Sequence, residues 1–244
     1  MAAAVAVMAL PYTASAGAPY ATDDPEPTAY GHYEVYLFSE ATWGGETQTG
    51  TALGIEVNYG LLPDVQVTAA LPVGFDIPDD EGPRFGIGDA SIGVKYRFIH
   101  EDENSWIPQV AFFPSFEAAL VRSGSNGGDR PTHLILPVWA QKSIGDWTVF
   151  GGGGWHINDG VATQNSWFGG VGARTDLDAD LNVGGEIYRE SAEAAGGKTT
   201  TAFSLGANIQ LSDSWQLLGS IGAGVEDGSS ATAMTSYVAL KWSN

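Results

Sequence analysis

The feature that most limits the fold of this chain is an alternation of apolar and other side chains with a period of two residues. Between Val65 and Phe75 every odd-numbered residue is apolar, whereas the even-numbered positions hold polar or small residues and one proline. The segments Ala90–Phe98, Phe203–Leu211 and Trp215–Val225 repeat the pattern. Because successive side chains of a strand point to opposite faces, each segment is predicted to be a strand whose two faces meet different surroundings.

The same pattern continues through the rest of the chain and predicts an even number of strands. Twelve strands are expected, near residues 30–41, 51–59, 64–75, 87–98, 106–120, 132–142, 146–156, 165–174, 179–190, 200–211, 214–226 and 233–242. Short turns at 61–64, 143–146, 175–178 and 212–214 alternate with longer, polar, glycine-rich loops at 43–50, 76–86, 121–131, 158–164, 191–199 and 227–232. The connection 100–105 is longer than the other members of the short class.

Alternation of short turns and long loops on an even-stranded meander is typical of an outer-membrane barrel, with the short turns in the periplasm. The predicted fold class is therefore all-β, a closed antiparallel up-and-down transmembrane β-barrel of about twelve strands. The alternative is a soluble sandwich or a lipocalin-like barrel, which turns its apolar face inward. Twelve strands would enclose a lumen too wide for side chains to fill, so we expect the apolar faces to meet lipid.

Tryptophans near the strand ends fit the aromatic girdles that such barrels carry at the membrane surfaces. They are Trp106, Trp147, Trp155, Trp167, Trp215 and Trp242.

Composition excludes several classes of function. The chain has 10 lysines and arginines against 29 aspartates and glutamates, a net charge of −19, and such acidity argues against a nucleic-acid partner. Cysteine is absent, which excludes disulfides, thiolate metal sites and cysteine nucleophiles. After the first 20 residues no run of 18 apolar residues occurs, which excludes transmembrane helices.

The amino terminus resembles a secretory signal peptide. An apolar run up to Leu10 is followed by Pro11 and small residues, which matches the apolar region and cleavage zone of a signal peptide. The expected basic start is missing, because the first basic residue is Arg84; either the start is truncated or the segment is only an apolar tail. We expect residues 1–18 to be the signal, cleaved after Ala16 or Ala18, residues 19–29 to be a periplasmic or lumenal segment, and residues 30–244 to be the barrel.

Charged residues on the polar faces form two groups if the short turns lie in the periplasm. The basic residues Lys95, Arg97, Arg174 and Lys241 gather at the periplasmic end, and Glu34 is expected to meet Lys241 across the seam between the first and last strands. Acidic residues, namely Glu40, Glu117, Glu186, Glu190 and Glu226, dominate towards the outer mouth. Such a mouth favours cations or neutral solutes over anions, or else its carboxylates merely keep the lumen hydrated. The predicted pore-lining residues are Glu34, Glu56, Lys95, Arg97, Glu117, His133, His156, Arg174, Glu186 and Lys241.

Three stretches of the chain resemble the sequence motifs of one exported family. Thr22-Asp23-Asp24-Pro25 followed by Gly31-His32-Tyr33-Glu34-Val35 is similar to the opening of that family, and Gly60-Leu61-Leu62-Pro63-Asp64 is similar to one of its hairpins. Gly86-Ile87-Gly88-Asp89-Ala90, continuing to Lys95-Tyr96-Arg97, is the best match. The family is that of the outer-membrane proteins of the MetA pathway of phenol degradation. The resemblance covers about Thr22 to Trp242 and implies a Gram-negative outer-membrane barrel that moves hydrophobic or aromatic small molecules.

The carboxyl end departs from what outer-membrane barrels often show. Assembly machinery reads a terminal aromatic residue in many of them, but Ser243 and Asn244 follow Trp242 here. The outer-membrane assembly machinery is nevertheless an expected partner.

Enzymatic and metal chemistry find little support. His156 with Asn158 is the nearest approach to a catalytic pair, and Ser166 on the next strand could approach it, but a lumenal position is the stronger interpretation. Asp176, Asp178 and Asp180 resemble half a calcium loop, yet the sixth position is Leu181 and the twelfth is Ile187, so an acidic hairpin turn is expected. The glycines at 151–154, 169–170, 172 and 184–185 lack the residues of a phosphate-binding loop and are expected to permit curvature or to leave room in the lumen.

The function predicted from the sequence is a passive outer-membrane channel for small solutes, including hydrophobic or aromatic ones. No catalytic residue, metal or cofactor is predicted, and the expected partners are membrane lipid and a small-molecule solute. The alternative is a non-conducting barrel with a structural or adhesive role. The sequence does not fix the transported solute, the pore size or the oligomeric state.

Overall fold

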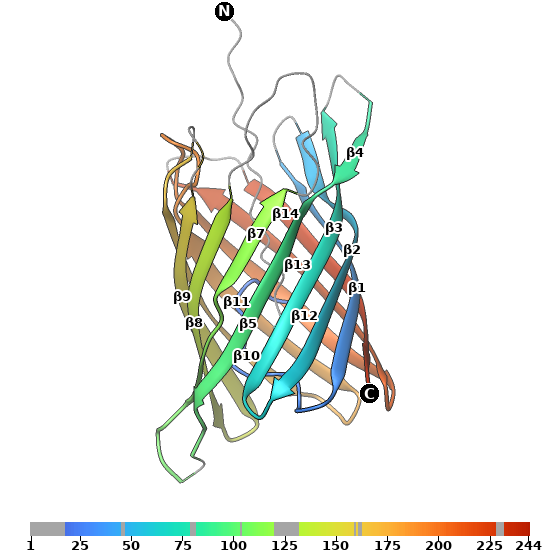
Figure 1. The fold of residues 1–244 in the computed structure, drawn as a ribbon, viewed down its shortest axis with the longest axis vertical. Coiled ribbons are helices and arrows are strands. Elements are labelled where there is room, and N and C mark those ends of the chain that lie inside the picture. Colours follow the sequence, from blue (N-terminus) through green and yellow to red (C-terminus); the bar gives the residue numbers. More distant parts are fainter. Residues whose placement is uncertain are drawn as a thin grey trace, which may run out of the picture.

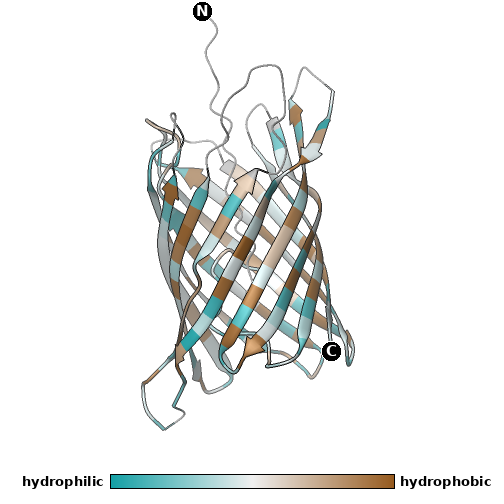
Figure 2. Cartoon of the chain, viewed as in Figure 1, coloured by the Kyte–Doolittle hydropathy of each residue, from teal (hydrophilic) through white to brown (hydrophobic). Residues whose placement is uncertain are grey.

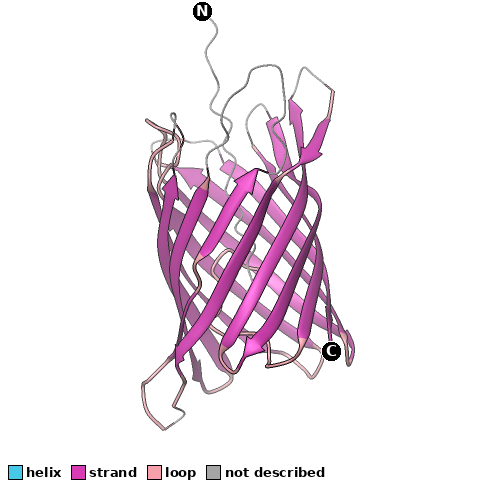
Figure 3. Ribbon diagram, in the orientation of Figure 1, coloured by secondary structure: helices cyan, strands magenta, loops and turns pink. Residues whose placement is uncertain are grey.

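The computed structural model describes residues 18–44, 47–78, 82–102, 104–119, 132–158, 160, 163–227 and 232–244. This part of the chain consists of strands and connecting segments (Figure 3). The strands are β1 (Tyr33–Trp43), β2 (Thr47–Leu62), β3 (Val65–Pro78), β4 (Arg84–Ile87), β5 (Asp89–Ile99), β6 (Gln109–Phe112), β7 (Ser115–Ala119), β8 (His133–Ile144), β9 (Trp147–Asn158), β10 (Ser166–Asp176), β11 (Leu181–Glu190), β12 (Thr200–Ser212), β13 (Trp215–Glu226) and β14 (Thr232–Ser243).

These fourteen segments form twelve strands of a closed barrel (Figure 1). β4 and β5 are two parts of one strand, because both pair with β3 and only Gly88 separates them. β6 and β7 are likewise two parts of one strand, interrupted at Pro114, which has no backbone N–H to donate to the ladder. All neighbours are antiparallel, and β1 pairs with β14, which closes the sheet. The predicted fold class is confirmed.

The two faces of each strand differ in the predicted sense. Along β5, Ile92, Val94 and Tyr96 are exposed on the outside of the barrel, whereas Ser91 and Lys95 are buried on the inside. Hydrophobic and hydrophilic residues alternate along the strands in the cartoon coloured by hydropathy (Figure 2). A closed barrel that turns its large apolar side chains outward satisfies every ladder hydrogen bond and suits a hydrocarbon surrounding.

No helix in the described ranges is both long enough and apolar enough to cross a membrane.

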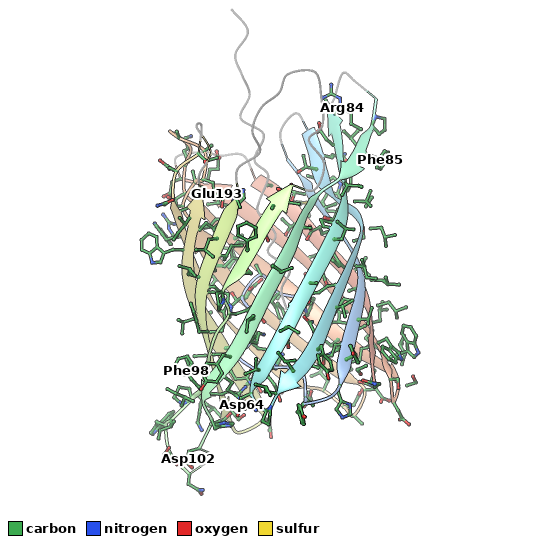
Figure 4. All side chains as sticks on the ribbon, viewed as in Figure 1. Asp64, Arg84, Phe85, Phe98, Asp102 and Glu193 are labelled. Atoms are coloured by element: carbon green, nitrogen blue, oxygen red, sulfur yellow. The ribbon has the colours of Figure 1, made fainter. Side chains whose placement is uncertain are left out.

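The connections divide between the two ends of the barrel. We call one end the turn end; it holds connections 63–64, 100–108, 145–146, 177–180 and 213–214 and the carboxyl terminus. The other, the loop end, holds connections 44–46, 79–83, 120–132, 159–165, 191–199 and 227–231. Asp64 and Asp102 mark the turn end, and Arg84, Phe85 and Glu193 mark the loop end (Figure 4). The predicted loop 43–50 is wrong, because the β1–β2 ladder continues to the pair Trp43–Gln48.

The seam between β1 and β14 contains the predicted ion pair. Glu34 and Lys241 lie near the turn end, and Lys241 Nζ is 2.6 Å from Glu34 Oε1. The two ends of the barrel sheet are therefore joined by side chains as well as by the ladder.

Candidate functional site

Residues 18–29, which we call the plug segment, lie inside the barrel. The segment precedes β1, and its trace runs within the ring of strands (Figure 1). It contacts inward-facing side chains of strands on opposite walls, Glu186 of β11 and Lys95 of β5. Of its twelve residues, Tyr20, Thr22 and Asp23 are among those with almost no exposed surface. Of the two positions predicted for this part of the chain, the contacts correspond to the lumenal one. The predicted signal and its cleavage sites lie outside the described residues, except Ala18.

Acidic residues of the plug segment meet the basic residues of the wall. Lys95 Nζ is fully buried, lies 3.1 Å from Asp23 Oδ2 and donates a hydrogen bond of 2.7 Å to the carbonyl oxygen of Asp24. The carboxylate of Asp24 also lies 3.6 Å from Arg174 Nη1. The plug segment thus compensates the positive charges of two wall residues, Lys95 of β5 and Arg174 of β10.

The opposite contacts of the plug segment run to β11, β12 and β13. Glu186 accepts hydrogen bonds from the backbone N–H groups of Ala21 at 2.8 Å and Thr22 at 2.7 Å. The hydroxyl of Ser220 donates to the carbonyl oxygen of Pro19 at 2.6 Å. Hydrogen bonds from two adjacent backbone N–H groups to one carboxylate fix the orientation of the backbone at that point. Glu186 therefore fixes the path of the plug segment at Ala21 and Thr22. The sequence placed Glu186 towards the outer mouth; the structure places it at mid-strand, under the plug segment.

Glycines leave the space that the plug segment occupies. A Cβ on Gly206 would lie 2.8 Å from atoms of Pro19 and Tyr20, and one on Gly184 would lie 2.7 Å from the hydroxyl oxygen of Tyr20. A Cβ on Gly170 would overlap Thr22 Oγ1. Any larger residue at these inward positions would displace the segment, so glycine here leaves room in the lumen, one of the two predicted uses.

A further ion pair lies at the turn end. Arg97 Nη2 donates to Asp64 Oδ1 at 2.6 Å, and His100 Nε2 lies 3.1 Å from Asp64 Oδ2. Partial burial opposes ionisation of Asp64, but the hydrogen bonds and charge of Arg97 outweigh it and lower the pKa of this carboxyl below its ordinary value of 3.8.

The loop-end half of the lumen is acidic. Glu40 of β1, Glu117 of β7, Glu190 of β11 and Glu193 of the 191–199 connection lie there, and we call this set the acidic chamber. Glu117 is within electrostatic reach of Glu40 and Glu193, and Glu190 is within reach of Glu193, so carboxylates from several walls act on one space.

Glu193 is held by histidines. Its carboxylate lies 2.5 Å from His156 Nδ1 and 4.0 Å from His133 Nδ1. Burial would raise the pKa of Glu193, but its hydrogen bonds, above all the one from His156, outweigh burial and lower the pKa.

The geometry does not form a hydrolase triad. Ser166 is the direct cross-strand partner of His156, yet its hydroxyl donates at 3.4 Å to Glu193 Oε1, the same oxygen that His156 contacts. A triad requires the hydroxyl to bond the second imidazole nitrogen, and His156 Nε2 has no partner among the described residues. In the same ranges, no group of three or more potential ligands is arranged to hold a metal ion.

Aromatic side chains share the inner face with these polar groups. Trp139 and Phe168 have ring centroids 5.9 Å apart, and Phe38 and Tyr237 have centroids 6.0 Å apart. His156 stacks against Phe168 at 4.6 Å. The lumen therefore offers both rings and carboxylates.

All ten residues predicted to line the pore lie on inward positions of the strands. Lys95, Arg174 and Glu186 contact the plug segment. Glu34 pairs with Lys241, Arg97 with Asp64 and His156 with Glu193. Glu56 accepts a hydrogen bond of 2.8 Å from Asn58, and His133 and Glu117 are cross-strand partners near the loop end. Sequence reasoning missed Asp23, Asp24 and Glu193. The first two belong to the Thr22-Asp23-Asp24-Pro25 stretch that carries the family resemblance, and that stretch was the one available signal.

Solved structures share the fold of this chain. No family model and no curated protein matches it. An outer membrane channel from Pseudomonas putida F1 is 14% identical over 91% of this chain and 98% of its own length, with a TM-score of 0.72. The translocator domain of the autotransporter NalP from Neisseria meningitidis is 12% identical over 88% of this chain and 89% of its own, with a TM-score of 0.53. The KdgM porin in complex with disordered oligogalacturonate is 7% identical over 85% of this chain and 98% of its own, with a TM-score of 0.53.

The closed barrel, its outward apolar surface and these likenesses define the class of protein. The chain is a bacterial outer-membrane β-barrel, and the outer membrane is its location.

Proposed function

We propose that the protein is a passive channel for small hydrophobic or aromatic solutes, and that it belongs to the family that its motifs resemble. The observation that carries the proposal is a lumen lined by aromatic pairs, Trp139 with Phe168 and Phe38 with Tyr237, between polar walls. Rings in a hydrated lumen give an apolar solute a surface to contact without requiring a covalent step. The ten inward residues named above line this path, and no catalytic residue takes part.

The turn end faces the periplasm in this proposal, as short turns do in outer-membrane barrels. Residues 1–18 act as the export signal, and the assembly machinery inserts the barrel. Passage then runs from the acidic chamber past the plug segment, which narrows the turn-end half of the lumen.

A planar bilayer and a liposome-swelling assay test the channel. Stepwise conductance and swelling in small neutral aromatic solutes are expected from the purified barrel. Folding is verified by a heat-dependent shift in electrophoretic mobility. Folded protein that gives neither conductance nor swelling, even after the plug segment is loosened, would contradict the channel.

The second candidate is a non-conducting barrel with a structural or adhesive role. The plug segment favours it, because hydrogen bonds and ion pairs anchor that segment to both walls. If the intact barrel shows no conductance but a barrel that lacks residues 19–28 conducts, the result would support a channel with a closed resting state. If neither the intact nor the shortened barrel conducts ions, the result would support the structural role.

A further inference from the structure

Charge is compensated differently in the two halves of the lumen. In the turn-end half, Lys95 and Arg174 pair with the plug segment, Arg97 pairs with Asp64, and Lys241 pairs with Glu34. In the acidic chamber, no lysine or arginine of the described ranges pairs with Glu40, Glu117 or Glu190. Among the described side chains, Glu40 accepts a hydrogen bond of 2.8 Å from the hydroxyl of Thr51. The loop-end half therefore keeps an excess of negative charge.

His156 gives a second and independent indication of a ligand. Its side chain is 4% exposed, and its Nε2 is buried and has no hydrogen-bond partner among the residues that the structure describes. Because Nδ1 contacts the carboxylate of Glu193, the proton of the neutral ring is assigned to Nδ1, which leaves Nε2 as a hydrogen-bond acceptor. Glu40 Oε2 is a second buried acceptor that has no hydrogen-bond partner in the described part of the chain. Buried acceptors are nearly always satisfied, so a molecule that donates hydrogen bonds fits this space.

The rings beside these acceptors narrow the chemistry further. Phe168 lies against His156, and Trp139 lies beside Phe168. The faces of aromatic rings attract cations as well as apolar groups. A ligand with N–H donors, a positive charge and an apolar body would match the unpaired acceptors, the negative charge and the aromatic rings of the chamber.

We infer that the acidic chamber binds small organic ammonium ions, primary amines with an aromatic body above all. This deepens the proposed channel function and rests on it for the route of entry, but binding itself does not require conduction. The ammonium group donates to an acceptor of the chamber, namely Glu40, Glu117 or His156 Nε2, and the aromatic body of the amine contacts Phe168.

Three probes of one shape test the charge preference. Benzylamine is a cation at neutral pH, benzyl alcohol is neutral and benzoate is an anion. Calorimetry on the full-length folded barrel in detergent should detect benzylamine, with benzyl alcohol at least about tenfold weaker and no binding of benzoate. In a planar bilayer under a salt gradient, the reversal potential should show cation preference, and benzylamine should block the potassium current.

Variants connect the binding to the chamber. Glu117→Gln and Glu40→Gln should each weaken benzylamine roughly three- to tenfold, as removal of one partly screened charge predicts. Asp213→Asn, at an exposed turn of the opposite end, should leave it unchanged. The two glutamates lie on different strands, so if one variant fails to fold, the other still tests the inference.

The outcomes separate the inference from the channel. The inference would be overturned if benzoate and benzylamine bound equally well, or if neither glutamine variant changed the binding of benzylamine. Liposome swelling in benzyl alcohol would still support the channel in that case. Binding of benzylamine by a barrel that never conducts would uphold the inference and remove the channel. Arg122 and Arg130 belong to the segment 120–131, outside the described residues. If benzylamine binds only after both are changed to glutamine, the chain's own arginines are the occupants and the inference is wrong.

Discussion

The ammonium group of Lys95 lies 3.1 Å from the carboxylate of Asp23, and neither side chain has more than 3% of its surface exposed. Lys95 belongs to the wall, whereas Asp23 belongs to the plug segment, so this contact is one of those that hold the segment in the lumen. Loss of one partner of a buried pair typically costs about 3–5 kcal/mol. Without the charge of Asp23, the nearest carboxylate to Lys95 is that of Asp24, whose Oδ1 lies at 3.8 Å. The lumen can hydrate the charge of Lys95 only if the plug segment moves away.

Asp23→Asn is therefore expected to loosen the plug segment and to increase single-channel conductance, with more frequent current fluctuations. Bilayer recordings measure both. Glu26→Gln is the matched control, because Glu26 is an exposed acid of the same segment. Conductance that does not differ between the two variants would show that the Lys95 contact does not hold the segment.

A steric change should have the same effect as the charge change. Gly206→Val places methyl groups where Pro19 and Tyr20 lie, and it should expel the tip of the plug segment and raise conductance. In Gly219→Val the new side chain points outward, where the nearest atom to a Cβ is the carbonyl oxygen of Tyr237 at 3.6 Å. This control should conduct like the parent. A Gly206→Val barrel that folds and conducts like the parent would argue against the glycine cradle.

The strands and the seam could be predicted from the sequence because both depend on local pattern. Alternation fixes which residues face inward, and the order of an up-and-down meander then places Glu34 opposite Lys241. The β1–β2 loop was predicted too long for a related reason. Threonine and glycine around Gln48 carry no clear alternation, yet the ladder continues through them.

The plug segment could not be predicted in the same way. Residues 18–29 form no strand, and their partners are 38 to 201 positions away in the chain. Asp23 meets Lys95 only because the closed barrel brings the wall around the segment. Glu193 was missed for the same reason, since a loop residue has no periodicity and its histidines lie on two other strands.

The ion pair at the seam should stabilise the barrel only slightly. Lys241→Met removes the contact with Glu34 and is expected to reduce the free energy of unfolding by about 0.2–1 kcal/mol, because both side chains are partly exposed. Urea titration followed by tryptophan fluorescence measures the change. Lys198→Met, at an exposed loop lysine, should not alter it. A loss of several kcal/mol would mean that Lys241 has a larger role in closing the barrel.

The turn at Asp64 should give the barrel part of its acid sensitivity. The pKa of Asp64 is lower in the folded state than its ordinary value of 3.8, so its contribution to stability is full above that value and is lost as the pH falls through the folded pKa. Asp64→Asn removes the titrating carboxyl and keeps a residue that tolerates the positive φ of 67° at this position. The variant should be less stable than the parent at pH 6, and the difference should shrink below about pH 4 as the parent loses its ion pairs with Arg97 and His100. Urea midpoints measured from pH 6 to pH 2.5 test this. Asp213→Asn changes an exposed turn carboxylate at the same end and should have the urea midpoint of the parent at every pH. If the difference in midpoint between the Asp64 variant and the parent were the same at every pH, the geometry of the turn rather than its charge would determine the loss of stability.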